Sequence, residues 1–231
     1  MQPAADSVRR PPPLAHNRRM LSAPAFAPLT FLLIATAYLL GSLSGARVLA
    51  RLRGRDPGPS SGEPALVSRG RVVIAAQLGF DIGKGALAAW LALRHAPVGD
   101  LLSVTAHGYL AAFAAGFGHA WPIWHRFRGS APTTVVVGGL LVLWPVGLVA
   151  WLIAGLLVWL LSGYAGLALV LGALCLLLLA WWGGSDPPRL WFAGSAVLLM
   201  VLAQRDHLLR LWAGTEPQFA RARRMHRWRR R

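Results

Sequence analysis

Long apolar segments constrain this chain more than any other feature of its sequence. Six of them follow one another and cover residues 29–50, 72–93, 101–117, 135–161, 166–182 and 190–203. A bilayer core about 30 Å thick needs roughly 20 helical residues, so the first two segments predict one transmembrane helix each. The fourth is longer and contains Pro145, which interrupts helical hydrogen bonding. We therefore expect an all-α integral membrane protein, a compact bundle of about seven transmembrane helices with some short or broken. Six is the alternative if the fourth segment does not split.

The chain has few charged residues, and most of them are basic. Only 14% of the residues are charged and the formal net charge is +16, whereas soluble domains carry about 25% charged residues. A basic balance could indicate nucleic acid. Here, however, the Arg residues lie between the apolar segments and at both ends, an arrangement typical of loops beside anionic lipid. We expect membrane phospholipids as partners and no nucleic acid. Cys175 is the single cysteine and lies in an apolar segment, so neither an intramolecular disulfide nor a metal site built from thiolates is expected.

The Arg clusters predict an orientation. The loops after the first and third segments are basic, as is the tail from Arg205, whereas the loop that holds Arg94 and Asp100 is nearly neutral. By the positive-inside rule, the basic loops and the tail face the cytoplasm of a bacterial inner membrane and the N-terminus lies outside. The basic residues before residue 20 oppose this orientation. The expected organisation is a disordered tail at 1–28, a membrane domain at 29–217 and a basic cytoplasmic tail at 218–231.

The first polar motif lies at the end of the first apolar segment and in the loop that follows it. Gly41–Gly45 is rich in Gly and Ser, which usually indicates close helix packing. In the loop, Ser61 and Gly62 precede Arg69 and Arg71. Backbone N–H groups and guanidinium groups in such a loop can share a bound phosphate. Both interpretations remain open for this motif.

The second motif places Asp81 and Lys84 inside an apolar segment. Residues three apart share one face of a helix, and a charge inside a membrane is costly enough to suggest a function. Lys84 is the single Lys among 24 basic residues, and Lys and Arg are not interchangeable. The structural alternative is a simple ion pair with Asp81.

Two further motifs follow. Residues 118–129 contain His119 and several Trp and Arg residues, which either form an interfacial aromatic belt or belong to a site. Residues 204–217 place Arg205 and Arg210 on a short amphipathic stretch. Taken alone, this stretch predicts a surface helix that stops at Gly214.

Taken in order, these motifs resemble the membrane glycerol-3-phosphate acyltransferases that use acyl phosphate, over roughly residues 36–217. The Asp-x-x-Lys-Gly motif of that family is matched fully, and the other motifs in part. The residues that carry the resemblance are Gly41, Ser42, Gly45, Ser61, Gly62, Asp81, Lys84, Gly85, Gly118, His119, Pro122, Phe127, Arg128, Gly129, Arg205, Arg210, Leu211, Gly214, Thr215 and Glu216.

The resemblance implies transfer of an acyl group from acyl phosphate to the 1-hydroxyl of glycerol 3-phosphate, giving lysophosphatidic acid for phospholipid synthesis without a metal or other cofactor. Two phosphates must then lie close together, which requires cations and backbone donors. The implied catalytic residues are Ser61, Arg71, Lys84 and His119. The implied substrate-binding residues are Gly62, Arg69, Asp81, Gly85, Arg128, Gly129, Arg205, His207, Arg210 and Glu216.

The chain also departs from the family pattern. Glu63 stands where the family has a neutral amide and would repel a phosphate. Residues 130–132 are Ser-Ala-Pro in place of Gly-Lys-Gly, so a cation and a backbone donor are lost from the phosphate loop. In the tail, the family's His and Asn are replaced by Gln204 and His207. A second interpretation therefore stays open, a catalytically degenerate homologue that binds lipid or a partner protein. A small transporter is disfavoured because no internal repeat is found. The sequence indicates no particular oligomeric state.

Overall fold

The computed structural model describes residues 28–45, 47–48, 71–97, 100–127 and 129–217. All regular structure in these ranges is helical, which confirms the expected all-α fold. The elements are α1 (Pro28–Ser42), α4 (Arg71–His95), α5 (Val104–Ala120), the 3-10 helix η1 (Ile123–His125), α6 (Thr133–Leu143), α7 (Pro145–Ser162), α8 (Ala165–Trp182), α9 (Pro187–Ala203) and α10 (Arg205–Trp212). The expected terminal tails lie outside the described residues, apart from Pro28, which begins α1.

The helices differ in length, as expected for a bundle in which some helices are short or broken. By length and composition, α4 (from Val72), α7 and α8 can each cross a membrane, and α9 and α10 qualify together as a pair bent by 64°. Helices α1 and α6 have only 15 and 11 residues. Among the described residues, the seven helices α1 and α4–α9 correspond to the expected segments. The first apolar segment runs on to residue 50, but α1 ends within it at Ser42, in the Gly41–Gly45 motif that resembles the end of the family's first span.

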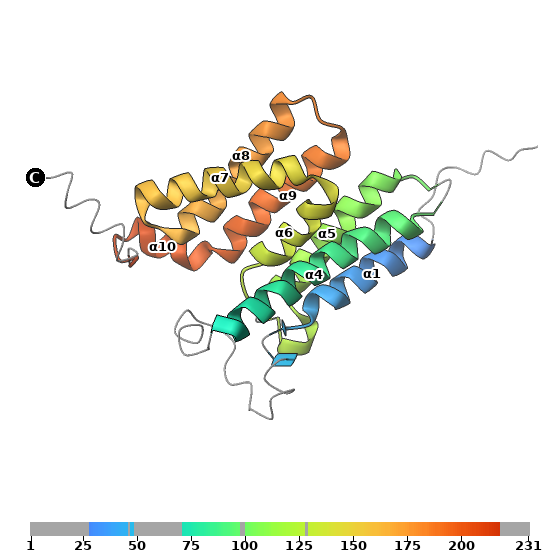
Figure 1. The fold of residues 1–231 in the computed structure, drawn as a ribbon, viewed down its shortest axis with the longest axis horizontal. Helices are drawn as coiled ribbons and strands as arrows, with labels where there is room; N and C mark the ends of the chain where they lie inside the picture. The colour runs from blue at the N-terminus through green and yellow to red at the C-terminus, as the bar shows by residue number, and fades with distance from the viewer. Residues whose placement is uncertain (1–27, 46, 49–70, 98–99, 128, 218–231) are drawn as a thin grey trace, which may run out of the picture.

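The expected break at Pro145 is confirmed. Trp144 leaves the helical region with φ −155° and ψ 73°, and Pro145 then begins α7, where its missing N–H is tolerated. The backbone N–H of Trp144 still bonds to the carbonyl of Leu140 and closes α6. The chain turns at this point, so α6 and α7 are separate helices, and α7 runs back toward α10 (Figure 1).

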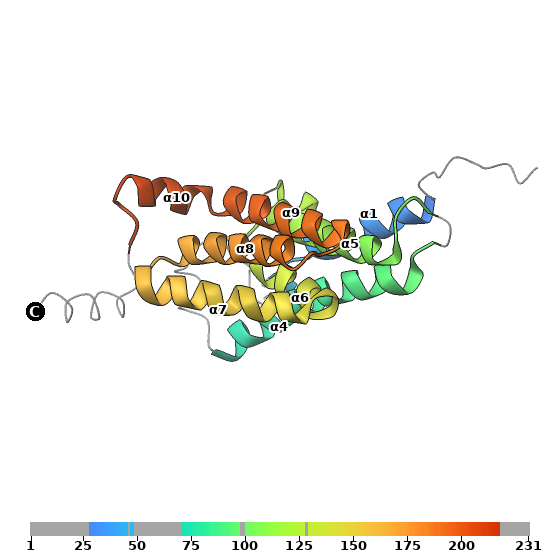
Figure 2. The ribbon, with the colours of Figure 1, turned by 90° about the horizontal axis from the view of Figure 1, so that it is seen from above.

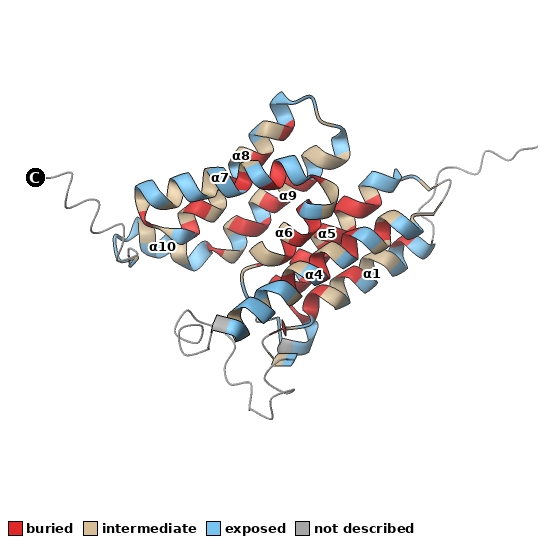
Figure 3. Ribbon diagram, viewed as in Figure 1, coloured by how far each residue is buried: buried red, intermediate tan, exposed pale blue. Residues whose placement is uncertain are grey.

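Two groups of helices make up the bundle. Helices α1, α4, α5 and α6 lie on one side, and α7, α8, α9 and α10 on the other (Figures 1 and 2). Buried residues concentrate where α4, α5 and α6 cross (Figure 3). Glycines allow the backbones of these helices to come close to one another where they cross. A Cβ on Gly85 of α4 would lie 2.0 Å from the carbonyl oxygen of Val135, and one on Gly41 of α1 would lie 2.0 Å from that of Ala115.

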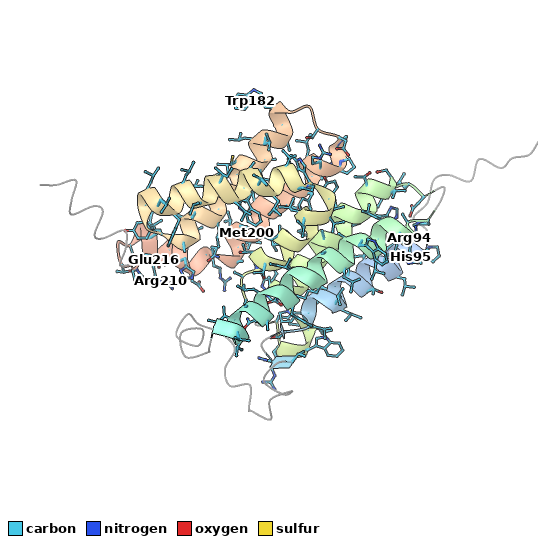
Figure 4. The ribbon with its side chains drawn as sticks, in the orientation of Figure 1. Arg94, His95, Trp182, Met200, Arg210 and Glu216 are labelled. Carbon is cyan, nitrogen blue, oxygen red and sulfur yellow. The ribbon has the colours of Figure 1, made fainter. Side chains whose placement is uncertain are left out.

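The outer surface suits lipid. Large apolar side chains along α7 are half exposed, among them Val149, Leu152 and Leu156, and apolar surface this extensive marks a membrane-facing protein. Trp181 and Trp182 are 74% and 86% exposed at the end of α8, the position of an interfacial aromatic belt. In Figure 4, Trp182 lies at the top of the view, whereas Arg210 and Glu216 lie together at its left side.

Candidate active site

Lys84 is the centre of a buried polar cluster where α1, α4 and α5 meet. Its Nζ lies 2.9 Å from Asp81 Oδ1 and 2.8 Å from His119 Nδ1. It also donates to the carbonyl oxygens of Gly41 and Leu43, at 3.0 and 2.6 Å. Asp81 and Lys84 are each only 3% exposed. One ammonium group therefore joins three helices, and the expected shared face of Asp81 and Lys84 is confirmed.

The same contacts cap the end of α1. The last carbonyls of a helix have no partner within it, and a cation near them also complements the helix dipole. Lys84 satisfies two such carbonyls at the end of α1. In addition, the Ser42 hydroxyl donates to the carbonyl of Tyr38 at 2.9 Å. The Gly-Ser motif thus ends α1 beside the buried cation, and its Gly41 also packs closely on α5, as one of the two open interpretations predicted.

His119 links this cluster to the surface. Its Nε2 lies 2.8 Å from the hydroxyl oxygen of Ser130. His119 is 8% exposed, whereas Ser130 is exposed. Four side chains thus contact one another in series, from the interior to the surface: Asp81, Lys84, His119 and Ser130. Sequence reasoning missed Ser130, because it appeared only as a loss from the family's phosphate loop.

The loop after α5 brings Ser130 to His119. The Gly129 N–H donates to the carbonyl of Ala120 at 3.2 Å, and a Cβ on Gly129 would lie 2.1 Å from the carbonyl oxygen of His119. Arg126 and Phe127 adopt φ values of 52° and 59°, a left-handed conformation that costs energy for residues other than glycine. The loop thus folds tightly back on the end of α5, and only glycine fits at position 129.

The expected tail helix is confirmed as α10, which ends at Trp212, and Gly214 follows in the turn with φ 69°. Glu216 accepts hydrogen bonds from His207 Nδ1 and Arg210 Nε, both at 2.7 Å. Burial alone would raise the pKa of the Glu216 carboxyl, but these hydrogen bonds and the nearby positive charges outweigh it and hold the pKa below its ordinary value. Arg205 lies outside this cluster and pairs with Asp206 at 3.5 Å on the exposed surface.

The predicted site residues are thus brought together only in part. Lys84, Asp81 and His119 meet, and Gly129 packs beside them. Gly85 lies at the crossing of α4 and α6 rather than in the polar cluster. The residues of the α10 cluster form a second group, which shares no hydrogen bond or ion pair with the first in the described part of the chain. Ser61, Gly62, Arg69, Arg128 and the side chain of Arg71 lie outside the described residues.

A further polar cluster, which sequence reasoning missed, joins the first turns of α1 and α5. Thr30 Oγ1 donates to Asp100 Oδ2 and lies 2.9 Å from His107 Nε2, which is 3.2 Å from the same carboxylate. His107 Nδ1 lies 2.9 Å from the carbonyl oxygen of Ser103. The signal available was one His in an apolar segment after an Asp. The cluster ties together the helix ends away from the Lys84 cluster.

Comparison with known proteins finds one family whose members match most of this chain. The family model described as "Glycerol-3-phosphate acyltransferase" matches residues 31–214. The glycerol-3-phosphate acyltransferase of Actinobacillus pleuropneumoniae serotype 5b (strain L20) is 36% identical over 203 residues, which cover 83% of this chain and 97% of that protein. The enzyme of the same name from Serratia proteamaculans (strain 568) is 34% identical over 196 residues, covering 80% and 86%.

Solved structures agree on the fold. The crystal structure of PlsY (YgiH), an integral membrane glycerol 3-phosphate acyltransferase, in its lysophosphatidic acid form, superposes with a TM-score of 0.71 at 22% identity and covers 83% of this chain and 96% of that one. The fold is therefore that of an integral membrane acyltransferase. The chain itself belongs to the glycerol-3-phosphate acyltransferase family, as its motifs indicated.

Proposed function

We propose that the chain transfers an acyl group from acyl phosphate to the 1-hydroxyl of glycerol 3-phosphate. The bond between the carbonyl carbon and the hydroxyl oxygen forms, the bond from that carbon to the phosphate oxygen breaks, and the hydroxyl proton leaves with the phosphate. The products are lysophosphatidic acid and inorganic phosphate. The observation that carries this proposal is the family match across residues 31–214, which includes the whole Asp81–Lys84–His119 cluster.

The roles of the residues follow the need to hold two phosphates near each other. Ser61 and Gly62 hold one phosphate together with Arg71 or Arg69. Arg128 and Gly129 bind the other in the positive field of Lys84. These roles are supported by the family motifs and by the position of Gly129 beside the buried cluster.

The tail supplies the remaining groups. Arg205 and Arg210 contribute positive charge around the phosphates, as does His207 when it is protonated. Glu216 is structural, a role supported by its hydrogen bonds to His207 and Arg210. On this view Asp81 and Gly85 support the site through the ion pair with Lys84 and the close crossing of α4 and α6.

The activity is tested with purified protein in detergent, labelled glycerol 3-phosphate and acyl phosphate, with acyl-coenzyme A as an alternative donor. We expect labelled lysophosphatidic acid from acyl phosphate alone. Product from acyl-coenzyme A alone would contradict the proposed donor. Binding of glycerol 3-phosphate without any product would favour the degenerate, lipid-binding homologue.

The site and the basic tail are proposed to face the cytoplasm of the bacterial inner membrane. The Arg-rich loops and the tail support this orientation. Replacing Cys175, the single cysteine, with Ala and introducing one cysteine at residue 220 allows side-specific labelling. A membrane-impermeant maleimide should leave residue 220 unlabelled in intact cells and label it after lysis, whereas labelling in intact cells would reverse the orientation.

A further inference from the structure

The contacts that connect Asp81 to Ser130 favour one hydrogen-bond direction. The Lys84 ammonium carries three donors and no acceptor, and it shares them among two backbone carbonyls, Asp81 Oδ1 and His119 Nδ1. Because a cation faces Nδ1 at 2.8 Å, the contact favours the tautomer in which Nδ1 is unprotonated and Nε2 carries the hydrogen. In that tautomer His119 donates from Nε2 to Ser130 Oγ, 2.8 Å away.

This direction argues against one role for Ser130. In a serine nucleophile the His accepts the hydroxyl proton, and a carboxylate holds the opposite ring nitrogen. Here a cation contacts the opposite nitrogen instead, so the arrangement does not match that of an activated serine. When the Ser130 oxygen accepts from His119, its own hydrogen has no acceptor among the described residues.

Ser130 lies in the same loop that has lost a cation relative to the family pattern. Where the family resemblance expects Gly-Lys-Gly, this chain has Ser130-Ala131-Pro132 and lacks the cation at the middle position. Ser130 is exposed, and Gly129 holds it against the end of α5. A hydroxyl group oriented from behind by an imidazole is a suitable hydrogen-bond donor to an anion.

We propose that Ser130 donates a hydrogen bond to a substrate phosphate, and that His119 and Lys84 are positioning residues that orient its hydroxyl. The proposal rests on the acyltransferase function proposed above. The Ser130 hydroxyl would then be a hydrogen-bond donor that partly replaces the cation missing from the phosphate loop. The phosphate belongs either to glycerol 3-phosphate or to acyl phosphate, and the two are distinguished by their separate KM values.

The first test compares Ser130→Ala with Ser130→Thr. One hydrogen bond to a charged group corresponds to roughly a 10- to 100-fold change, so Ser130→Ala should lower kcat/KM by that factor. The KM should rise for the substrate whose phosphate is bound. Ser130→Thr keeps the hydroxyl and should retain most activity. Ser195→Ala is the matched control, because within the described part of the chain that hydroxyl bonds only to the carbonyl of Phe192 on α9, and it should behave as wild type.

The second test separates positioning from folding. In His119→Asn the side-chain oxygen can replace Nδ1 as the acceptor for Lys84, but no donor reaches Ser130. In His119→Gln the amide nitrogen can replace Nε2. We expect His119→Asn to fold and to lose about as much activity as Ser130→Ala, His119→Gln to retain more, and the double variant Ser130→Ala/His119→Asn to lose no more than either single variant.

Wild-type kinetics for Ser130→Ala with both substrates would overturn the proposal, as would fully additive losses in the double variant. If the wild-type protein shows no turnover, the acyltransferase function fails, and titration calorimetry with glycerol 3-phosphate and with inorganic phosphate replaces the kinetic measurement. A tenfold weaker affinity of Ser130→Ala would then still support the hydroxyl donor. Equal affinity for both ligands would refute it.

Discussion

Two clusters of the described residues, those around Asp81 and around Glu216, each bring a carboxylate to basic side chains, and their surroundings differ. In the first, the Asp81 and Lys84 side chains are 5% and 2% exposed, and the ammonium also contacts α1 and α5. In the second, Glu216 is 9% exposed but Arg210 is 45% exposed. The basic side chains of this second cluster belong to α10, and Glu216 lies in the turn that follows α10.

The comparison shows that burial, rather than contact distance, determines the consequence of an ion pair. Both pairs are shorter than 3 Å. A buried pair has lost its hydration, so removing one partner leaves an uncompensated charge in the interior. A partly exposed pair is screened by water and contributes little to stability. The first cluster should therefore hold the fold together, and the second should order only the turn that follows α10.

The largest effect is expected for Lys84→Met, which leaves Asp81 buried without its cation. The cost should be about 3–5 kcal/mol of stability, measured by thermal unfolding in detergent. Adding Asp81→Asn should recover part of the stability but not the activity, because His119 loses its partner. A double variant that regains both would show that Lys84 serves only as the partner of Asp81, and unchanged stability of the single variant would contradict the comparison.

Gly85→Ala should also be destabilising, since its Cβ would lie 2.0 Å from a backbone oxygen of α6. Helices α4 and α6 must then separate, at a cost of about 1–3 kcal/mol. Gly83→Ala is the matched control on the same helix, because a Cβ there meets nothing within 4 Å. It should stabilise the helix by up to about 1 kcal/mol. Equal unfolding temperatures for the two variants would show that the crossing is not tight.

Glu216→Gln should have a smaller effect, below about 1 kcal/mol, because its partners are partly exposed. The global unfolding temperature should hardly change. Amide hydrogen exchange at Thr215 and Glu216, whose N–H groups bond to the carbonyl of Arg210, should become faster. Faster exchange in α4 as well would show that the tail cluster supports the whole fold.

The same cluster should respond to acid. The folded pKa of Glu216 lies below its ordinary value, so its stabilising contribution is full above the ordinary pKa, about 4.3. That contribution is lost as the pH falls through the lower, folded value. Exchange protection at residues 215 and 216 should therefore persist at pH 5 and disappear in stronger acid. In Glu216→Gln this acid-dependent step should be absent.

The smallest effect on stability is expected for Arg205→Ala. The Arg205 and Asp206 side chains are 75% and 73% exposed, so their pair should add nothing measurable. If Arg205 binds substrate as proposed, the KM for glycerol 3-phosphate should rise while the unfolding temperature stays constant. An unchanged KM would remove Arg205 from the site.

Features encoded locally could be predicted from the sequence. The apolar segments, the break at Pro145, the shared helix face of Asp81 and Lys84 and the stop at Gly214 each depend on residues within a few positions of one another. The family followed from the order of such motifs. The end of α1 also lies in its Gly-Ser motif, but the group that caps it could not be predicted, because Lys84, which satisfies the last carbonyls, is distant in the sequence.

Only the tertiary structure decided which groups meet Lys84 and which carbonyls approach Gly85. The Gly41 carbonyl and His119 are 43 and 35 positions away from Lys84. In a membrane protein the lipid is as apolar as the core, so these helices carry no polar stripe that marks an outer face. The sequence by itself thus determined the helices and the chemistry they carry, whereas the crossings, set by glycine contacts and by one buried cation, decided how that chemistry is assembled.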